Sequence, residues 1–228
     1  MWQPAMFDYA TKRVIPERTS ILYYKVAVYA DATQVKPFPA GMKIVAGDPL
    51  ASAPVQYGPA SFSCDGNAVG NDNTFPYVPD PRGPHTIPSM ADCGVGHEIH
   101  AQVVFPSCWD GVNLDSPDHR SHMVYNFPPG PEGNQNGACP PSHPVVVPQI
   151  TVKMVYPIVQ GDNTANWRLT SDTYSDTLPA GYSLHADWFN AWDPAIMQTW
   201  VTDCLVAGND CQAHMLGDGR VMDEFNGN

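Results

Sequence analysis

Runs of β-branched and aromatic residues recur along the chain and are separated by clusters of Pro, Gly and Asn, which is typical of antiparallel β proteins. Residues 19–29 and 42–47 form the first two runs. Apolar and polar positions alternate in 97–105, 150–156 and 181–189. A strand has a side-chain period of two, so one face of each segment is expected to point into the core.

The alternation predicts which side chains of two strands face inward. The apolar positions on one face are Ile99, Ala101, Val103 and Phe105 in the first strand and Tyr182, Leu184, Ala186 and Trp188 in the second. The same pattern turns His100, His185 and Asp187 outward.

Two further segments depart from the strand pattern. Residues 51–96 have little periodicity and many Gly, Pro, Asn and Ser, which indicates a long irregular segment. A helix is predicted after Asp193, which can cap it, with Pro194 in the first turn and Gly208 after its end. Its apolar positions recur at helical spacing, namely Ile196, Met197, Trp200, Val201 and Leu205.

Together these elements predict a mainly β fold, an antiparallel β-sandwich of jelly-roll type with long loops and one carboxy-terminal α-helix. The sequence shows no internal repeat, low-complexity tract or linker. Residues 1–228 are therefore expected to form a single domain.

Six cysteines add cross-links to this fold. Their spacing includes no CxxC pair, which favours disulfides over a structural zinc site. Local loops favour sequential pairing, although six cysteines allow 15 connectivities. The expected bonds are Cys64–Cys93, Cys108–Cys139 and Cys204–Cys211. Disulfides indicate an oxidising compartment, so the chain is expected to be secreted and extracellular.

The charge limits the partners. A formal net charge of −12 disfavours nucleic acid and anionic membrane surfaces, and leaves neutral glycans, cations and other proteins open. No apolar run approaches the roughly 18 residues of a membrane span. The segment 1–4 lacks the basic and apolar regions of a signal peptide, so we expect a mature product or a piece of a longer chain. No N-glycosylation sequon occurs.

The densest polar stretch is 107–122. It contains the carboxylates Asp110, Asp115 and Asp118 and the imidazoles His119 and His122. These residues are candidates for acid–base chemistry or metal binding. The alternative is a structured loop in which Asp and Asn side chains bond backbone amides.

His185 and Asp187 form a second candidate. They project from the same face of a predicted strand and could share a metal ion or a proton. The alternative is a surface His bonded to a surface Asp. His97 and His100 are three residues apart on a strand, so they are not expected to chelate together, and His143 is expected in a turn.

Aromatic residues near the polar segments suggest a sugar-binding surface, because Trp and Tyr rings stack on the apolar faces of sugars. We assign Trp109, Asp115, Trp192 and Asp193 as candidate substrate-binding residues. Most Trp residues are expected in the core, so an exposed one would strengthen this interpretation. The sequence contains no nucleophile elbow, P-loop, dinucleotide fingerprint or HExxH motif.

Several motifs match a known family. The matching segments are 37–42, 46–48, 105–111, 115–123, 139–144 and 181–193. Two are especially specific, Cys-Pro-x-x-His-Pro in 139–144 and Gly-x-x-x-His-x-Asp at the start of 181–193. On these motifs the chain resembles the secreted fungal and actinobacterial family called domain of unknown function nineteen-ninety-six. The resemblance implies export, often beside carbohydrate-binding or cell-wall modules, but no established activity.

The resemblance also implies an amino-terminal His-x-His-Asp-Phe-Phe-Gly segment, which this sequence lacks. Two more histidines there would have strengthened a catalytic cluster, so their absence favours binding or structure over catalysis. Three functions remain open. They are an enzyme acting on polysaccharide as a hydrolase or lyase, a non-catalytic protein that binds glycan or self-associates, and a cation-binding structural domain. No cofactor is indicated beyond a divalent metal ion.

Overall fold

The computed structural model describes residues 1–27, 30–53, 59–66, 85–126, 138–212 and 214–222. In these ranges the secondary structure is mainly β, and the chain divides into two compact units. The first unit contains 1–23, 45–105 and 151–188, and the second contains 24–44, 106–150 and 189–228. The expectation of a single domain stays a prediction.

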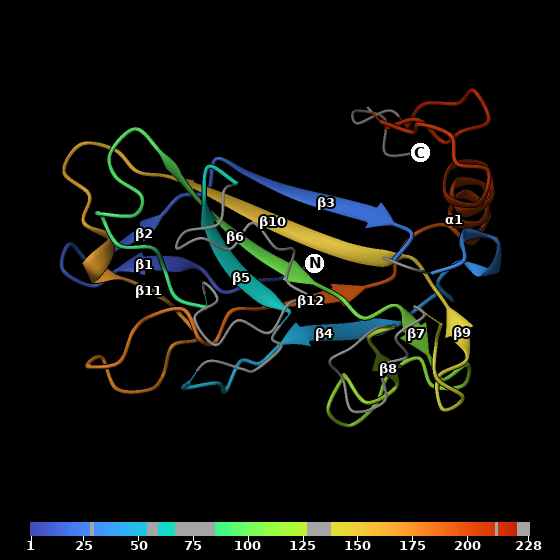
Figure 1. Ribbon diagram of the computed structural model, residues 1–228, viewed down its shortest axis with the longest axis horizontal. Helices are drawn as coiled ribbons and strands as arrows, with labels where there is room; N and C mark the ends of the chain where they lie inside the picture. The colour runs from blue at the N-terminus through green and yellow to red at the C-terminus, as the bar shows by residue number, and fades with distance from the viewer. Residues whose placement is uncertain (28–29, 54–58, 67–84, 127–137, 213, 223–228) are drawn as a thin grey trace. The chain divides into compact units, whose positions relative to one another are not determined.

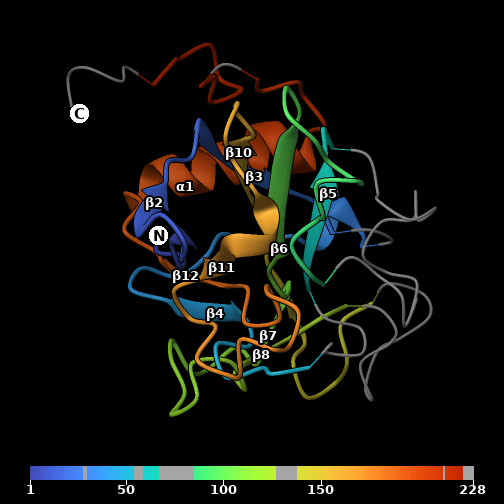
Figure 2. The ribbon, with the colours of Figure 1, turned by 90° about the vertical axis from the view of Figure 1, so that its left-hand side faces the viewer.

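A four-stranded sheet organises the first unit, in the order β3 (Thr19–Lys25), β10 (Gln149–Pro157), β6 (Glu98–Val104) and β5 (Ala60–Cys64). Figure 1 shows β10 between β3 and β6, and Figure 2 shows β5 on the other side of β6. β6 pairs antiparallel with both β10 and β5. β10 is buried along nearly its whole length, as is typical of a central strand.

The predicted alternation of β6 is confirmed. Ile99, Ala101, Val103 and Phe105 are all fully buried. His100, on the opposite face, is only partly exposed. The period of two therefore identified the core face of this strand correctly.

Three short strands complete a second sheet of the first unit. They are β1 (Met6–Asp8), β2 (Arg13–Ile15) and β11 (Trp167–Leu169), in the order β11-β1-β2. Both pairings are antiparallel and place Met6 opposite Leu169 and Ile15, which are all buried. None of these strands was predicted, because three residues are too few to show a period.

Two predicted strands are shorter in the structure. β3 ends at Lys25, and positions 28 and 29 of the predicted run lie outside the described residues. The run 181–189 becomes β12 (His185–Phe189), which pairs with β4 (Lys43–Gly47).

A turn explains the late start of β12. The carboxylate of Asp172 accepts hydrogen bonds from the amides of Gly181 and Ser183 and from Ser183 Oγ, at 2.9, 3.4 and 2.6 Å. The amide of Leu184 also donates to the carbonyl of Gly181. Gly181 has φ +112°, which a side chain would resist. Tyr182, which was expected to face inward, is therefore partly exposed, while Leu184, Ala186 and Trp188 are buried as expected.

The expectation of an irregular segment over 51–96 is also partly wrong. β5 lies within it, although 54–58 and 67–84 are outside the described residues. The strand has the sequence Ala-Ser-Phe-Ser-Cys, and only Phe62 is fully buried. One large apolar residue gives too weak an alternation to reveal a strand.

The second unit contains three two-residue strands and the helix. β7 (Cys108–Trp109) lies between β8 (Met123–Val124) and β9 (Val145–Val146), and both pairings are antiparallel. The predicted helix is confirmed as α1 (Pro194–Trp200), which continues as a π-helical turn, η3 (Val201–Val206). Short 3₁₀ helices occupy η1 (Ala32–Gln34) in this unit and η2 (Thr164–Asn166) in the first.

The predicted pairing of all six cysteines is confirmed. The bonds are Cys64–Cys93, Cys108–Cys139 and Cys204–Cys211. The mainly β fold class is confirmed as well, with antiparallel strand pairs, one carboxy-terminal helix and three disulfides. Within the described ranges, no helix has the length and apolar character needed to cross a bilayer.

Candidate functional site

The polar segment 107–122 lies in the second unit, where it connects β7 to β8. The amide of Asp110 donates to the carbonyl of His122 at 3.1 Å, so the two ends of the loop meet. The disulfide to Cys139 starts from Cys108, the first residue of β7. The candidate residues therefore lie in a loop whose ends are hydrogen-bonded to each other and which follows the disulfide-bonded strand β7.

Asp110 stabilises the first turn of this loop. Its Oδ1 accepts from the amides of Val112 and Asn113 at 2.8 and 2.9 Å, and its Oδ2 accepts from Asn113 Nδ2 at 2.7 Å. Burial raises the pKa of Asp110, but the hydrogen bonds outweigh it and the pKa lies below its ordinary value. Both carboxylate oxygens are used within the loop, which is the Asx-turn role considered from the sequence.

Asp118 stabilises the second turn. Its Oδ1 accepts from the amides of Arg120 and Ser121 and from the hydroxyls of Ser121 and Ser116, at distances between 2.8 and 3.1 Å. The amide of Ser121 is the largest cause of a pKa that lies far below the usual range of a carboxyl group. This residue too serves the shape of the loop.

His122 fastens the loop to β4. Its side chain is 1% exposed, and Nε2 lies 2.8 Å from the carbonyl of Lys43 while Nδ1 lies 2.8 Å from Ser116 Oγ. The amide of Lys43 donates in turn to the carbonyl of Leu114 at 2.9 Å. Since a carbonyl only accepts, Nε2 carries a proton and donates it. Both ring nitrogens are engaged in holding the loop.

Asp115 and His119 form a different arrangement. His119 Nδ1 lies 2.6 Å from Asp115 Oδ1, and Lys43 Nζ lies 3.3 Å from Asp115 Oδ2. The hydrogen bond from His119 is the largest cause of a lowered pKa of Asp115, and Lys43 adds to it. Asp115 is therefore ionised at neutral pH and orients an imidazole, with a cation on its other oxygen.

His119 is the accessible member of this group. Its side chain is 54% exposed, and among the described residues only its Nδ1 is bonded. A neutral imidazole that donates from Nδ1 to a carboxylate leaves a lone pair on Nε2. The arrangement can accept a proton from a bound molecule and return it, which is the chemistry of a general base and acid.

His185 and Asp187 lie on β12 of the first unit, and their side chains do not pair. His185 is 5% exposed, with Nδ1 2.7 Å from the carbonyl of Ser183, and the ring of Trp2 packs against it at 5.4 Å between centroids. The backbone of Trp2 bridges to Asp187. The prediction of an outward His185 is thus wrong, because the segment that carries Trp2 covers it.

The other candidate substrate-binding residues are engaged within the second unit. Trp109 and Trp192 are both partly buried, and their Nε1 atoms donate to the carbonyl of Asn113 at 2.6 Å and to Tyr24 Oη at 3.1 Å. Asp193 caps α1. These contacts give each residue a structural role. Of the four candidate substrate-binding residues, Trp109 and Asp115 lie in the same segment, 107–122, as His119, whereas Trp192 and Asp193 do not.

A model of the protein family described as "Domain of unknown function (DUF1996)" matches residues 1–192. The chain belongs to this family. The match confirms the resemblance seen in the sequence motifs. No curated protein and no solved structure shows significant similarity to the chain.

Several motif segments of the DUF1996 family lie in the second unit and are bonded within it. Asn190 Nδ2 donates to the carbonyls of Phe38 and Pro39 at 3.2 and 2.9 Å. The imidazole of His143 bonds the carbonyl of Ser121 through Nε2 at 3.1 Å, which fits the turn role expected for it. These two motif residues of the DUF1996 chain therefore serve the fold.

Two groups escaped the sequence reasoning. Lys43 was seen only as part of a predicted strand, and nothing local to it signals the distant polar loop. Asp65 and His97 form a second exposed pair, with Oδ2 2.6 Å from Nδ1, and His97 is the largest cause of the lowered pKa of Asp65. In the sequence, only the position of Asp65 directly after Cys64 hinted that its carboxylate lies beside the predicted disulfide.

Metal ligation was left open by the sequence. Among the described residues, one group of three potential ligands has its donor atoms within 4.8 Å of one another, namely Cys64, Asp65 and His97. The polar loop 107–122 contributes no residue to it.

Proposed function

We propose that this protein acts on extracellular polysaccharide and that His119 is its acid–base residue. The observation that carries the proposal is the pair of His119 and Asp115, with an exposed imidazole held at 2.6 Å by an ionised carboxylate. An exposed imidazole is hydrated by solvent and does not need a carboxylate that orients its ring. An oriented one is suited to proton transfer.

The extracellular setting rests on the three disulfides, which persist in oxidising compartments. The choice of polysaccharide as the substrate rests on the family resemblance, which implies that members often occur beside carbohydrate-binding or cell-wall modules. Secretion supplies contact with cell-wall glycans.

The residues favour elimination over hydrolysis. Hydrolysis by the common mechanism uses two carboxyl groups. Asp110 and Asp118 are both engaged by backbone amides, so neither is free to be the second. Elimination from a uronic acid residue needs one base and a cation beside the substrate carboxylate. His119 and Lys43 fit these roles.

The proposed reaction is an elimination that breaks a glycosidic carbon–oxygen bond. Nε2 of His119 takes the proton from C5 of the uronate, the bond between C4 and the glycosidic oxygen breaks, and a C4–C5 double bond forms. Water protonates the departing oxygen, and the hydroxide that remains takes the proton back from Nε2 of His119, which restores the neutral imidazole. Lys43 holds the substrate carboxylate through its remaining N–H groups and stabilises the negative charge that develops there.

The overall charge of −12 does not oppose this proposal at short range. Screening in physiological salt limits repulsion between exposed charges to about 8 Å. Lys43, which lies 3.3 Å from Asp115 Oδ2, is the cation that a sugar carboxylate would meet beside His119. Association from a distance would still be slow.

The test is an assay of the purified protein on polysaccharides with and without uronic acids. Elimination gives ultraviolet absorbance from the new conjugated double bond together with new reducing ends, whereas hydrolysis gives only reducing ends. We expect His119→Gln to lower the elimination rate by about 10²-fold or more. His85→Gln, which removes a histidine bonded to the carbonyl of Ala60, is the control and should keep the rate. No product from any polysaccharide, or an unchanged rate in His119→Gln, would refute the proposal.

A second candidate is glycan binding without catalysis, favoured by the exposure of Trp2. Its side chain is 51% exposed, whereas Trp167 and Trp188 are buried at 0% and 3%. An exposed indole can stack on a sugar ring. Affinity electrophoresis in glycan-containing gels should show retardation that Trp2→Ala abolishes, with Leu50→Ala as the exposed apolar control. Equal mobility of both variants and the parent protein would exclude this role for Trp2.

A further inference from the structure

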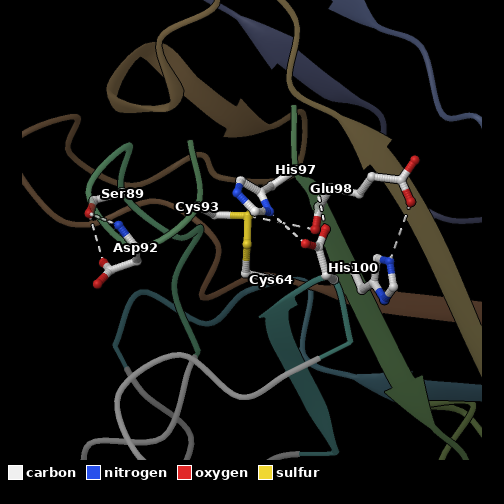
Figure 3. The surroundings of a disulfide bond; sticks show 8 residues. Cys64, Ser89, Asp92, Cys93, His97, Glu98 and His100 are labelled. Carbon is white, nitrogen blue, oxygen red and sulfur yellow. Dashed lines mark hydrogen bonds and ion pairs between the residues drawn. A yellow bond between two sulfur atoms is a disulfide. The ribbon is translucent and has the colours of Figure 1, made fainter. Parts of the chain in front are cut away.

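The Cys64–Cys93 disulfide of the first unit has unusual neighbours. Donor atoms of Cys64, Asp65 and His97 all lie within 4.8 Å of one another. Figure 3 shows His97 beside the disulfide, with Glu98 and His100 following it along β6. Two sulfur atoms, an imidazole and a carboxylate thus occupy one small volume.

Backbone bonds fix this group. The amide of Asp65 donates to the carbonyl of Glu98, and the amide of Glu98 donates back to Asp65 Oδ1, both at 2.8 Å. The amides of Cys93 and His97 are bonded at 2.9 and 3.1 Å to the carbonyls of Ser89 and Gly94. The donors are therefore positioned by the ends of β5 and β6 and by the turn between Ser89 and His97. They would remain close if the sulfur–sulfur bond opened.

The group is also accessible. The side chains of His97 and Asp65 are 56% and 43% exposed, and Cys64 is partly exposed, while Cys93 is buried at 1%. A reductant or a metal ion can reach the cluster from the side of His97. The fourth potential ligand, the sulfur of Cys93, is buried.

We propose that reduction of the Cys64–Cys93 disulfide creates a zinc site formed by both cysteines, His97 and Asp65. A disulfide sulfur is a poor ligand, whereas a thiolate is among the preferred ligands of zinc. In the oxidised protein the same residues form a covalent cross-link with an adjacent His–Asp pair. In the reduced protein they supply two sulfurs, one nitrogen and one oxygen, which are the donor types and the number of a tetrahedral zinc site.

The chemistry requires a reductant and is balanced by it. A dithiol gives two electrons and two protons to the disulfide, becomes a disulfide itself and leaves two cysteine thiols. Zinc then displaces the two thiol protons, and His97 binds through a neutral ring nitrogen. The site carries three negative ligand charges against the two positive charges of the ion.

The distances allow this with small movements. Zinc–ligand bonds of about 2.0–2.3 Å in a tetrahedron place neighbouring donor atoms roughly 3.3–3.8 Å apart. The widest spacing among Cys64, Asp65 and His97, which is up to 4.8 Å, needs to contract by about 1 Å. Asp65 Oδ2 and His97 Nδ1 are 2.6 Å apart, so if both bind the ion they give up their hydrogen bond and separate by roughly 0.7 Å. Opening of the disulfide frees Cys64 and Cys93 to turn toward the ion.

The consequence is a cross-link that survives a change of redox state. The disulfide ties the end of β5 to the turn before β6 in oxidising surroundings. Zinc would tie the same points when the thiols are free. Metal binding free energy would then replace the stabilisation lost with the covalent bond.

The test uses the full chain, oxidised or reduced with a phosphine, which takes up the oxygen of water as it delivers the electrons and does not compete as a thiol ligand. Zinc is titrated in competition with a chromophoric chelator. We expect one tight equivalent in the reduced protein only. Cobalt should give the absorbance of thiolate coordination in the reduced protein. His97→Gln and Asp65→Asn, which keep the disulfide, should each weaken binding by about 10-fold or more.

Control variants separate this site from other thiols. Replacing both Cys204 and Cys211 by Ser removes a second pair of potential thiols and should leave the affinity for zinc unchanged, as should His85→Gln. Equal binding by oxidised and reduced protein would overturn the proposal. So would unchanged affinity in His97→Gln, or a reduced chain that stays unfolded and binds no zinc when the ion is added.

Discussion

At the scale of single residues, three aspartates of one loop have different roles because their hydrogen-bond partners differ. Asp110 and Asp118 accept from nearby backbone amides and from neutral side chains of the same loop, and these bonds shape turns. Asp115 accepts from one backbone amide, that of Ser116, and also from the side chains of His119 and Lys43. Only the last arrangement leaves a reactive atom exposed.

The lowered pKa of Asp118 leads to a prediction about pH and stability. A carboxyl group whose pKa is lower in the folded state stabilises the fold above its ordinary value of 3.8, and this contribution disappears as pH falls toward the folded value. Asp118→Asn should therefore lower the free energy of unfolding at neutral pH by about 1 kcal/mol, since the group is exposed and screened by solvent. The difference should shrink as the pH drops below 3.8.

Thermal denaturation at a series of pH values checks this for the parent protein and the variant. Asp176→Asn replaces an exposed carboxylate of the other unit and serves as the control. A difference between Asp118→Asn and the parent protein that persists at low pH would contradict the electrostatic origin of the effect.

At the scale of elements, sequence patterns identified long elements and missed those that depend on distant partners. Seven-residue β6 and the capped α1 were predicted because period and caps are local. β7, β8 and β9 have two residues each and exist because they pair with one another. The candidate site followed the same rule. His119 was named from the loop composition, whereas Lys43 belongs to β4 and only the fold brings it to Asp115.

The cap of α1 gives a prediction for one element. Asp193 Oδ1 accepts from the amides of Ala195 and Ile196 at 2.8 and 3.1 Å. Asp193→Ala should lower the free energy of unfolding by about 1 kcal/mol, whereas Asp193→Asn keeps an accepting oxygen and should lower it by only a few tenths. Denaturant unfolding followed by circular dichroism measures both. Equal losses in the two variants would show that the cap does not act through these bonds.

At the scale of the whole molecule, composition and cysteine spacing predicted more than residue chemistry did. The mainly β class, the cysteine pairing and the family follow from features spread over most of the chain. The burial of His185 does not, because it depends on Trp2, which lies far from it in the sequence. Contacts between distant segments decide which polar residues remain accessible, and one sequence contains no direct record of them.

The disulfides should differ in their contribution to the stability of the chain, and loop length predicts the order. A cross-link restricts the unfolded state more strongly when it closes a longer loop. The separations are 29 residues for Cys64–Cys93, 31 for Cys108–Cys139 and 7 for the bond near the carboxy terminus. The corresponding losses on replacing each pair by Ala are about 3.6, 3.7 and 2.4 kcal/mol. Denaturant unfolding of the three double variants under oxidising conditions measures them. The variant that lacks the bond with separation 7 should be the most stable of the three, and a larger loss there than for either long loop would show that local strain or packing, rather than chain entropy, sets the order.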